Sequence, residues 1–438
     1  MTADAVPEVL AKACSEVRQA TPDDAVAGVV PRFVASPADV AEAAATMAAA
    51  ASLGLTSVPR GAGTRLAWGL PPTSCDLVVD TVRLNRVLEH AAGDLVVRVQ
   101  AGVGLDQLAA VLAKAGQRLA LDPPPSRGPA ADGARADTIG GILATGAAGP
   151  LRLRYGTPRD LAIGITVVRA DGTVASSGGK VVKNVAGYDL GKLFAGSYGT
   201  LGLIAEAAFR LHPLPGAAAF VTRDAADPDT AHAAIAAVAD SPLAPSAAEL
   251  DRPGRQAPIS VGVLLEGDPE GVAERSRRMA ELLGGTSVSP VPPAWWGRGA
   301  AAATDGTVIR IAFWAGELAR VLRAVDTAAS AAGLDPAVSG SAAAGVLYVA
   351  VDERAATAAV AQFVPDVRAA VGNQPVAGTA SASGPPSRGS AVVLHAPAEV
   401  RAAVDVWGPV PALGLMRAVK NQFDPEHRMA PGRFAGGI

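Results

Sequence analysis

Cysteine is scarce in this sequence, and its scarcity excludes several classes of protein. The 438 residues contain two cysteines, Cys14 and Cys75. Two thiols alone cannot build a disulfide framework, a four-cysteine zinc site or an iron–sulfur cluster. Any iron–sulfur relay that serves this protein must therefore come from another chain, and residence in the cytoplasm fits the composition best.

Strong net charge and long apolar runs are also missing. The formal net charge is -3, so the sequence offers no sign of a nucleic-acid partner. The start, MTADAVPEVL, lacks the basic region of a secretory signal, and we expect it to be frayed. The run from Val40 to Leu55 is mostly alanine but carries Glu42, which predicts a helix that does not span a membrane.

The pattern of apolar residues changes near Pro215. Before it, short strand patterns separated by glycine turns occupy 56–60, 76–81, 94–102 and 162–172, with a helical pattern over 104–117. After it, strands and helices alternate, which predicts an antiparallel sheet with helices on one face. The helical pattern over 353–372 is expected to break near Pro365, and we find no internal repeat of fixed period.

Two stretches, PRGAGT (59–64) and DTIGGILATGAAG (137–149), consist largely of glycine and small residues, and both are expected to be loops. A diphosphate requires many backbone N–H donors and tolerates no bulk, and glycine allows both close approach and positive φ. The Walker A pattern and a complete G-x-G-x-x-G motif are both absent. One such loop is commonly a tight turn, but a third glycine-rich segment, GSYGTLGLIAE (196–206), favours an anion-binding site.

The order of these segments resembles a known family. PRGAGTRLAWG, DTIGGILATGAAG, RYGTPRDLAIGITVVRADGTV and GGKVVKNVAGYDLGKLFAGSYGTLGLIAEAAFRLHPLP resemble the FAD domain of the vanillyl-alcohol oxidase superfamily, the PCMH-type flavoproteins. With the ending KNQFDPEHRMAPGRFAGGI, the chain is similar to the FAD-binding E subunits of bacterial glycolate oxidases.

This resemblance implies an α+β fold in four parts. An N-terminal segment (1–29) precedes a PCMH-type FAD-binding domain of two α/β subdomains (30–215). A ferredoxin-like cap domain with an antiparallel sheet (216–415) follows, and a C-terminal tail (416–438) returns to the FAD domain.

The resemblance also implies a set of cofactor-binding residues. The first loop would hold the FAD pyrophosphate, the second would close on the other side of the cofactor, and the third segment would approach it with its main chain. The residues are Arg60, Gly61, Ala62, Gly63 and Thr64; Thr138, Ile139, Gly140, Gly141 and Thr145; and Gly199, Thr200, Gly202 and Ile204. A further block is expected near the cofactor: Lys183, Asn184, Gly187, Tyr188 and Asp189.

The small number of histidines bears on how the cofactor is held and on which residue could act as a base. Some relatives attach FAD through a histidine of the first loop, where this chain has Ala62, so we expect non-covalent FAD. The 2-hydroxy-acid dehydrogenases of the superfamily carry paired histidines in the substrate domain, whereas this chain has only His232 and His395 between Pro215 and Met416. No metal site is expected. Arg433, in APGR, is either a partner for a carboxylate or phosphate or an ion-pair anchor for the tail.

Three functions remain open at this point. The chain is an FAD-binding subunit of a glycolate oxidase complex, in which a second FAD-binding subunit and an iron–sulfur subunit complete the oxidation of glycolate or a related 2-hydroxy acid to glyoxylate. Alternatively, it is a self-sufficient dehydrogenase with His395 or Tyr348 as base, or a non-catalytic structural subunit. Partner subunits would also provide any attachment to a membrane, and Trp295 and Trp296 are either a partner anchor or core aromatics.

Overall fold

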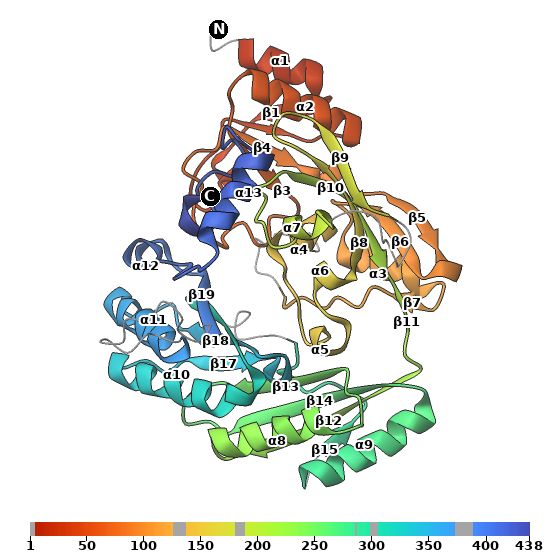
Figure 1. Ribbon diagram of the computed structural model, residues 1–438, viewed down its shortest axis with the longest axis vertical. Helices are drawn as coiled ribbons and strands as arrows, with labels where there is room; N and C mark the ends of the chain where they lie inside the picture. Colours follow the sequence, from red (N-terminus) through yellow and green to blue (C-terminus); the bar gives the residue numbers. More distant parts are fainter. Residues whose placement is uncertain (1–4, 126–136, 180–188, 285–286, 298–304, 373–388) are drawn as a thin grey trace.

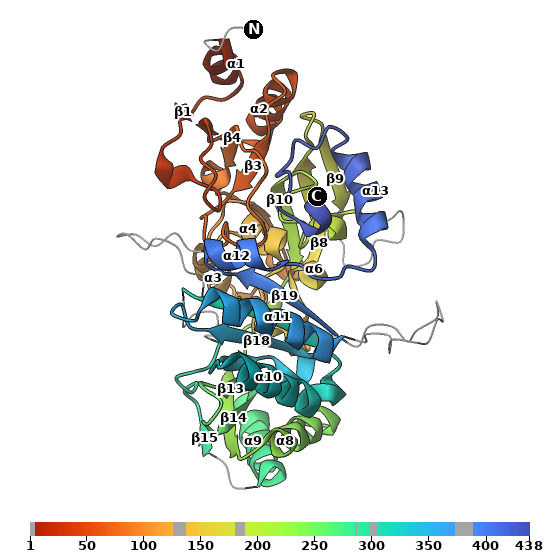
Figure 2. The same ribbon diagram turned by 90° about the vertical axis from the view of Figure 1, so that its left-hand side faces the viewer.

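The computed structural model describes residues 5–125, 137–179, 189–284, 287–297, 305–372 and 389–438. Two sheets lie side by side at one end of the molecule and a third lies at the other end, and the chain returns from the third sheet to the first two (Figures 1 and 2). No helix in these ranges is long and apolar enough to cross a bilayer.

The first sheet has the order β1-β2-β4-β3. Strands β2, β4 and β3 are parallel to one another, and β1 is antiparallel to β2. Its elements are α1 (Ala5–Ala13), β1 (Val17–Gln19), β2 (Phe33–Ala35), α2 (Val40–Ser52), β3 (Ser57–Arg60) and β4 (Leu77–Asp80). The expectation that residues 1–10 fray is wrong for the described part of this segment. Leu10 of α1 is fully buried beside α2, and this apolar contact holds the helix.

The second sheet is antiparallel, with the order β5-β6-β10-β8-β9. Its strands are β5 (Val87–Ala91), β6 (Val96–Gln100), β8 (Ala162–Val168), β9 (Val174–Gly178) and β10 (Leu203–Arg210). The helices around it are α3 (Leu105–Ala113), α4 (Ile139–Thr145), α5 (Arg152–Tyr155), α6 (Pro158–Leu161) and α7 (Gly191–Phe194). A short pair, β7 (Gln117–Arg118) with β11 (His212–Pro213), leads to the third sheet.

The third sheet has eight antiparallel strands, and α8–α11 cover its face away from the other two sheets (Figures 1 and 2). Its strands are β12 (Ala217–Ala225), β13 (Ala247–Arg252), β14 (Ile259–Gly267), β15 (Ser287–Ser289), β16 (Thr307–Phe313), β17 (Ala337–Gly340), β18 (Val346–Val351) and β19 (Gly389–His395). Its helices are α8 (Pro228–Asp240), α9 (Pro269–Leu283), α10 (Leu318–Ala332) and α11 (Thr357–Val371). The predicted antiparallel sheet with helices on one face is confirmed.

Two topologically identical halves form this sheet, a duplication that showed no periodic signal in the sequence. Each half runs strand–helix–strand–strand–helix–strand, the ferredoxin-like order, and the halves join where β13 pairs with β17. The break expected near Pro365 is wrong. Helix α11 continues through Pro365 because Phe363, Val364 and Val367 on its buried face pack into the core.

The chain then returns toward the first two sheets through α12 (Ala398–Ala403) and α13 (Leu413–Phe423). Val419 and Phe423 of α13 pack on the core of the second sheet. Lys420 and Asp424 form a fully buried ion pair at 2.7 Å, and the Lys420 ammonium also donates to the carbonyl oxygen of Thr200 at 2.7 Å. Residues after α13 are therefore held against the first two sheets.

Candidate functional site

A groove between the first two sheets collects both glycine-rich segments. Its lining residues are Val58, Pro59, Arg60, Gly61, Ala62, Gly63, Thr64, Arg65, Leu66, Thr138, Gly141, Ala144, Thr145, Tyr198, Gly199 and Arg433. Residues 58–66 belong to β3 or directly follow it, residues 138–145 cap or belong to α4, and Tyr198 and Gly199 precede β10. Segments far apart in sequence thus converge on one small-residue surface.

The second glycine-rich segment is a helix rather than the expected loop. The Thr138 hydroxyl accepts from the Gly141 N–H at the start of α4, and Ile139, Ile142 and Leu143 are buried in the core of the second sheet. These apolar side chains override the low helix propensity of the two glycines. Gly141 lies inside this helix and does not have a positive φ.

The glycines serve two separate purposes. A β-carbon at Gly61 would lie 2.1 Å from the Thr138 Oγ1, and one at Gly140 would lie 2.7 Å from the Ala101 β-carbon, so both allow close packing. A β-carbon at Gly141 would meet only the Thr138 Oγ1, at 3.1 Å, and Gly141 lines the groove. Gly63, with φ +82°, adopts the left-handed backbone that favours glycine. Gly141 therefore keeps the groove open, whereas Gly61 and Gly140 bring its walls together.

Asp137 joins the two segments across the groove. The Thr64 hydroxyl donates to the Asp137 carboxylate at 2.7 Å, and the Arg65 guanidinium pairs with the same carboxylate at 2.6 Å. Arg65 also donates to the carbonyl oxygen of Pro124 at 3.0 Å, and its side chain is 5% exposed. The charge of Arg65 is therefore neutralised within the wall of the groove.

Arg60 has its charge neutralised as well. Its guanidinium pairs with Asp80 at 2.8 Å and with Asp24 at 2.9 Å. A hydrogen bond from Arg18, opposed by burial and aided by Arg60, holds the pKa of Asp24 well below its usual range. Two carboxylates thus compensate this arginine before any cofactor binds.

Nine of the fourteen predicted cofactor residues line the groove, and Ile139, Gly140, Thr200, Gly202 and Ile204 do not. Ile139 and Gly140 are buried in α4, Ile204 is buried in β10, and the Thr200 hydroxyl bonds the Ser197 carbonyl oxygen at 2.7 Å. Of the further block, Lys183, Asn184, Gly187 and Tyr188 lie outside the described residues. Asp189 lies on the surface, 3.7 Å from Lys192.

Sequence reasoning missed Arg65 and Tyr198 as residues of the groove and left Arg433 undecided. Tyr198 has φ +57°, an uncommon conformation for a residue with a side chain, and only its position between glycines hinted at it. Arg433 is 3% exposed, and its Nη2 donates to the carbonyl oxygens of Leu66 at 2.9 Å and Trp68 at 3.0 Å. It forms no ion pair among the described residues, so the expected alternative of an ion-pair anchor for the tail is wrong.

The third sheet turns a polar cluster toward the second sheet. Tyr348 of β18 accepts a 3.0 Å hydrogen bond from Arg152 of α5, and its partner across the sheet is Arg310 of β16. Burial raises the pKa of Glu249 to about 8 and that of Asp122 to about 7. Arg310 and Tyr348 lie close enough to Tyr198, a residue of the groove, to affect its pKa.

The histidines lie elsewhere. None of the five is among the residues that line the groove. His395 bonds the carbonyl oxygen of Gly306 through Nδ1 at 2.9 Å, and His90 bonds Gln117 at 2.9 Å. His212 packs on Tyr155, and burial lowers its pKa. No cluster of three metal-binding side chains occurs in the described ranges.

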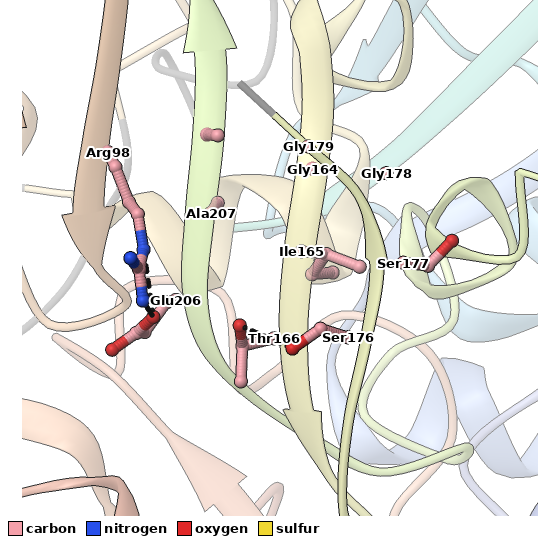
Figure 3. A pocket seen from close by; sticks show the side chains of 11 residues that line it. Arg98, Gly164, Ile165, Thr166, Ser176, Ser177, Gly178, Gly179, Glu206 and Ala207 are labelled. Carbon is pink, nitrogen blue, oxygen red and sulfur yellow. Dashed lines mark hydrogen bonds and ion pairs between the residues drawn. The ribbon is translucent and has the colours of Figure 1, made fainter. Parts of the chain in front are cut away.

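A second hollow of about 260 Å³ lies over the face of the second sheet (Figure 3). Arg98 pairs with Glu206 at its edge, with an Nε–Oε2 distance of 3.1 Å, and Thr166 and Ser176 share a 3.1 Å hydrogen bond. These four polar side chains of the hollow therefore bond one another in pairs.

Trp296, the expected partner anchor or core aromatic, packs edge-to-face on Phe220 at 5.0 Å and is partly buried.

Comparison with known proteins agrees with this geometry. Residues 31–178 match the FAD binding domain family. Two solved structures share the fold. The chain matches alkyldihydroxyacetonephosphate synthase with a TM-score of 0.67 and 17% identity, covering 92% of this chain and 76% of that one. It matches chitooligosaccharide oxidase with a TM-score of 0.64 and 15% identity, covering 97% of both chains. The predicted α+β PCMH-type fold is confirmed.

Curated relatives match over shorter regions. The glycolate oxidase subunit GlcD of Bacillus subtilis is 43% identical over 159 residues, which are 36% of this chain and 32% of that protein. An uncharacterized FAD-linked oxidoreductase of Mycobacterium tuberculosis is 32% identical over 277 residues, covering 63% and 56%. The glycolate oxidase subunit GlcE of Escherichia coli is 35% identical over 168 residues, covering 38% and 45%.

The matched regions therefore span between 32% and 56% of the length of these three relatives. The chain carries an FAD-binding domain and has homologues among the PCMH-type FAD oxidoreductases.

Proposed function

We propose that this protein is an FAD-dependent oxidoreductase subunit that binds FAD non-covalently in the groove between the first two sheets. It would support oxidation of a 2-hydroxy acid such as glycolate, within a complex that contains a second flavoprotein subunit and an iron–sulfur subunit. The observation that carries this proposal is the convergence of both glycine-rich segments on one groove within a matched FAD-binding domain.

The groove residues fit a flavin dinucleotide in three respects. Gly141 leaves space where a side chain would project, and Gly63 has a left-handed backbone. Arg433 lines the groove, and its buried Nε and Nη1 have no hydrogen-bond partner among the described residues. The segments around Gly61–Thr64, Thr138–Gly141 and Gly199 would hold the cofactor, which when bound supplies the acceptor for a hydride from the substrate. None of the lining residues is a histidine, which supports non-covalent binding.

The substrate would bind on the side of the groove that faces the third sheet. Arg310 has no ion-pair partner among the described residues, and it lies beside Tyr348 in the sheet. A cation and a phenol on one face suit a small carboxylate that carries a hydroxyl group. This cluster also favours a second candidate function, a self-sufficient dehydrogenase with Tyr348 as proton acceptor. His395 is less suited because it does not line the groove, although the contact of its Nδ1 with the Gly306 carbonyl oxygen leaves Nε2 as the basic nitrogen.

Anaerobic mixing separates the two functions. The isolated, FAD-loaded chain is mixed with glycolate or D-lactate while the visible flavin band is recorded. As a subunit without its partners, the chain should bleach slowly or not at all, because loss of a positioned base costs on the order of 10²–10⁴-fold in rate. A bleaching rate of about 10 s⁻¹, which is typical of enzymes, would favour the self-sufficient dehydrogenase. Tyr348→Phe would then test the base.

A further inference from the structure

The C-terminal tail enters the candidate cofactor groove. The Ser57 N–H donates to the carbonyl oxygen of Arg428, and the Ala430 N–H donates to that of Ser57, both at 2.8 Å. Leu70 N–H then donates to the carbonyl oxygen of Arg433 at 3.1 Å. Met429 thus forms an isolated parallel bridge with Ser57 of β3, and these hydrogen bonds hold the backbone of residues 428–433 at the wall of the groove.

An aromatic cluster holds the same part of the tail from the other side. Phe434 packs on Trp407 at 4.7 Å between ring centroids and on Tyr198 at 5.7 Å, and Tyr198 packs on Trp407 at 5.1 Å. Tyr198 itself lines the groove. Arg433 therefore lies between a tail segment bridged to β3 and three packed rings, with little freedom to move its guanidinium into water.

No described residue supplies a counter-charge to Arg433. Its side chain is buried, and its Nε and Nη1 have no hydrogen-bond partner among the described residues. Burial lowers its pKa to about 10, and the nearby Arg401 acts in the same direction. Arg60 and Arg65, the other arginines of the groove, each pair with carboxylates. A buried cation without a counter-charge is destabilising unless a ligand supplies one.

We propose that Arg433 binds an anionic group of the cofactor, so that the C-terminal tail forms one wall of the cofactor site. This inference rests on the proposed function, because it takes the ligand of the groove to be FAD. The anionic group is either the diphosphate or the ring system in its reduced, negatively charged form. Both offer acceptors to the two free N–H positions of the guanidinium.

The proposal predicts opposite effects on stability and on binding. Replacing Arg433 by methionine removes a buried, unpaired cation and keeps most of the side-chain volume. The cofactor-free protein should therefore unfold at the same temperature as wild type or a higher one. The dissociation constant for FAD should rise by at least about 30-fold, because a buried charge-assisted contact is lost.

The experiment compares wild type, Arg433→Met, Arg433→Lys and Arg417→Met as apoproteins. Arg417 is the matched control, since it is exposed on the same tail and donates only to the carbonyl oxygen of Gly436, at 3.0 Å. Thermal unfolding is measured without ligand, and FAD and ADP are titrated by calorimetry. The midpoint potential of bound FAD is measured for each variant. Arg433→Lys keeps the charge and should retain part of the affinity.

A loss of ADP affinity in Arg433→Met places the diphosphate at Arg433. Unchanged ADP binding with weaker FAD binding and a lowered midpoint potential places the ring there. Wild-type FAD affinity and potential in both Arg433 variants would overturn the inference. So would a loss of apoprotein stability that fully accounts for the weaker binding. If wild type itself binds no FAD, it is the proposed function that fails.

Discussion

The Thr64 hydroxyl donates a 2.7 Å hydrogen bond to the Asp137 carboxylate, and this contact ties the first glycine-rich segment to the second. Arg65, one residue further along, pairs with the same carboxylate at 2.6 Å. One acidic residue therefore sets the separation of the groove walls, although its side chain carries no chemistry of its own in the proposed reaction.

Asp137→Asn should destabilise the protein because it leaves the buried Arg65 guanidinium without a counter-charge. Breaking one partner of a buried ion pair costs about 3–5 kcal/mol. Urea unfolding of the apoprotein measures this loss. Asp189→Asn is the control, since Asp189 pairs with Lys192 on the surface at 3.7 Å. A loss of under 1 kcal/mol at Asp137, on the scale of an exposed pair, would show that this contact does not hold the walls.

Gly141→Val should abolish FAD binding with little loss of apoprotein stability. The new side chain would project into the groove and would approach only the Thr138 hydroxyl closely. Valine has a higher helix propensity than glycine, so the substitution should not weaken α4 through its backbone. Flavin content after reconstitution and apoprotein unfolding are the two measurements.

Gly61→Ala is the matched variant, and it should lower the stability of the apoprotein more than it lowers flavin content. Its β-carbon would overlap the Thr138 Oγ1 at 2.1 Å, so the walls must separate and the fold should lose about 1–3 kcal/mol. Full flavin content in Gly141→Val would refute the assignment of the groove. Equal destabilisation by both variants would mean that Gly141 is needed for packing alone.

Stability should fall as pH rises through the neutral range, because of Glu249. Burial raises its pKa to about 8 from an ordinary value of 4.5, so the folded state binds more protons than the unfolded state between these values. Unfolding free energy therefore decreases from about pH 4.5 to about pH 8 and levels off above. Glu249→Gln should flatten this slope, by an amount on the order of a few kcal/mol across the window. An unchanged slope in denaturant titrations from pH 5 to pH 8.5 would contradict this account.

Lys420→Met should loosen the tail. It leaves Asp424 fully buried and unpaired, with an expected cost of about 3–5 kcal/mol. Because Asp424 also accepts from the N–H groups of Arg428 and Met429, the tail segment that leads to Arg433 should open first. Hydrogen exchange at residues 428–433 measures this. Lys420→Met combined with Asp424→Leu should recover much of the stability.

Periodicity and turn residues in the sequence predicted the order and type of most elements. The alternation after Pro215 gave the antiparallel sheet correctly because its strands bury one apolar face under the helices. Prediction from the sequence pattern failed at two places. At α4, the core contacts of Ile142 and Leu143 outweigh the low helix propensity of two glycines, and at Pro365 the buried face of α11 holds the helix together in spite of the proline ring. Both errors come from tertiary packing that local propensity does not contain.

The site was predictable where it depends on backbone and not where it depends on distant side chains. The family resemblance carried by the glycine-rich segments implied fourteen cofactor residues, and nine of these line the groove. Asp137 and Tyr198 gave no comparable signal as wall residues. The partners of Asp137, Thr64 and Arg65, lie more than 70 positions away. The sequence also could not show that Arg433 lacks a counter-charge among the described residues, because this depends on how the tail packs beside β3.

The central claim is that the groove between the first two sheets binds FAD without a covalent bond. The direct measurement is the flavin content of the purified chain, before and after acid precipitation, together with titration of the apoprotein with FAD. The account predicts a yellow protein with one FAD per chain, all of which enters the supernatant, and a colourless Gly141→Val variant. A wild-type chain that neither carries nor takes up FAD, or flavin that stays with the precipitate, would contradict it.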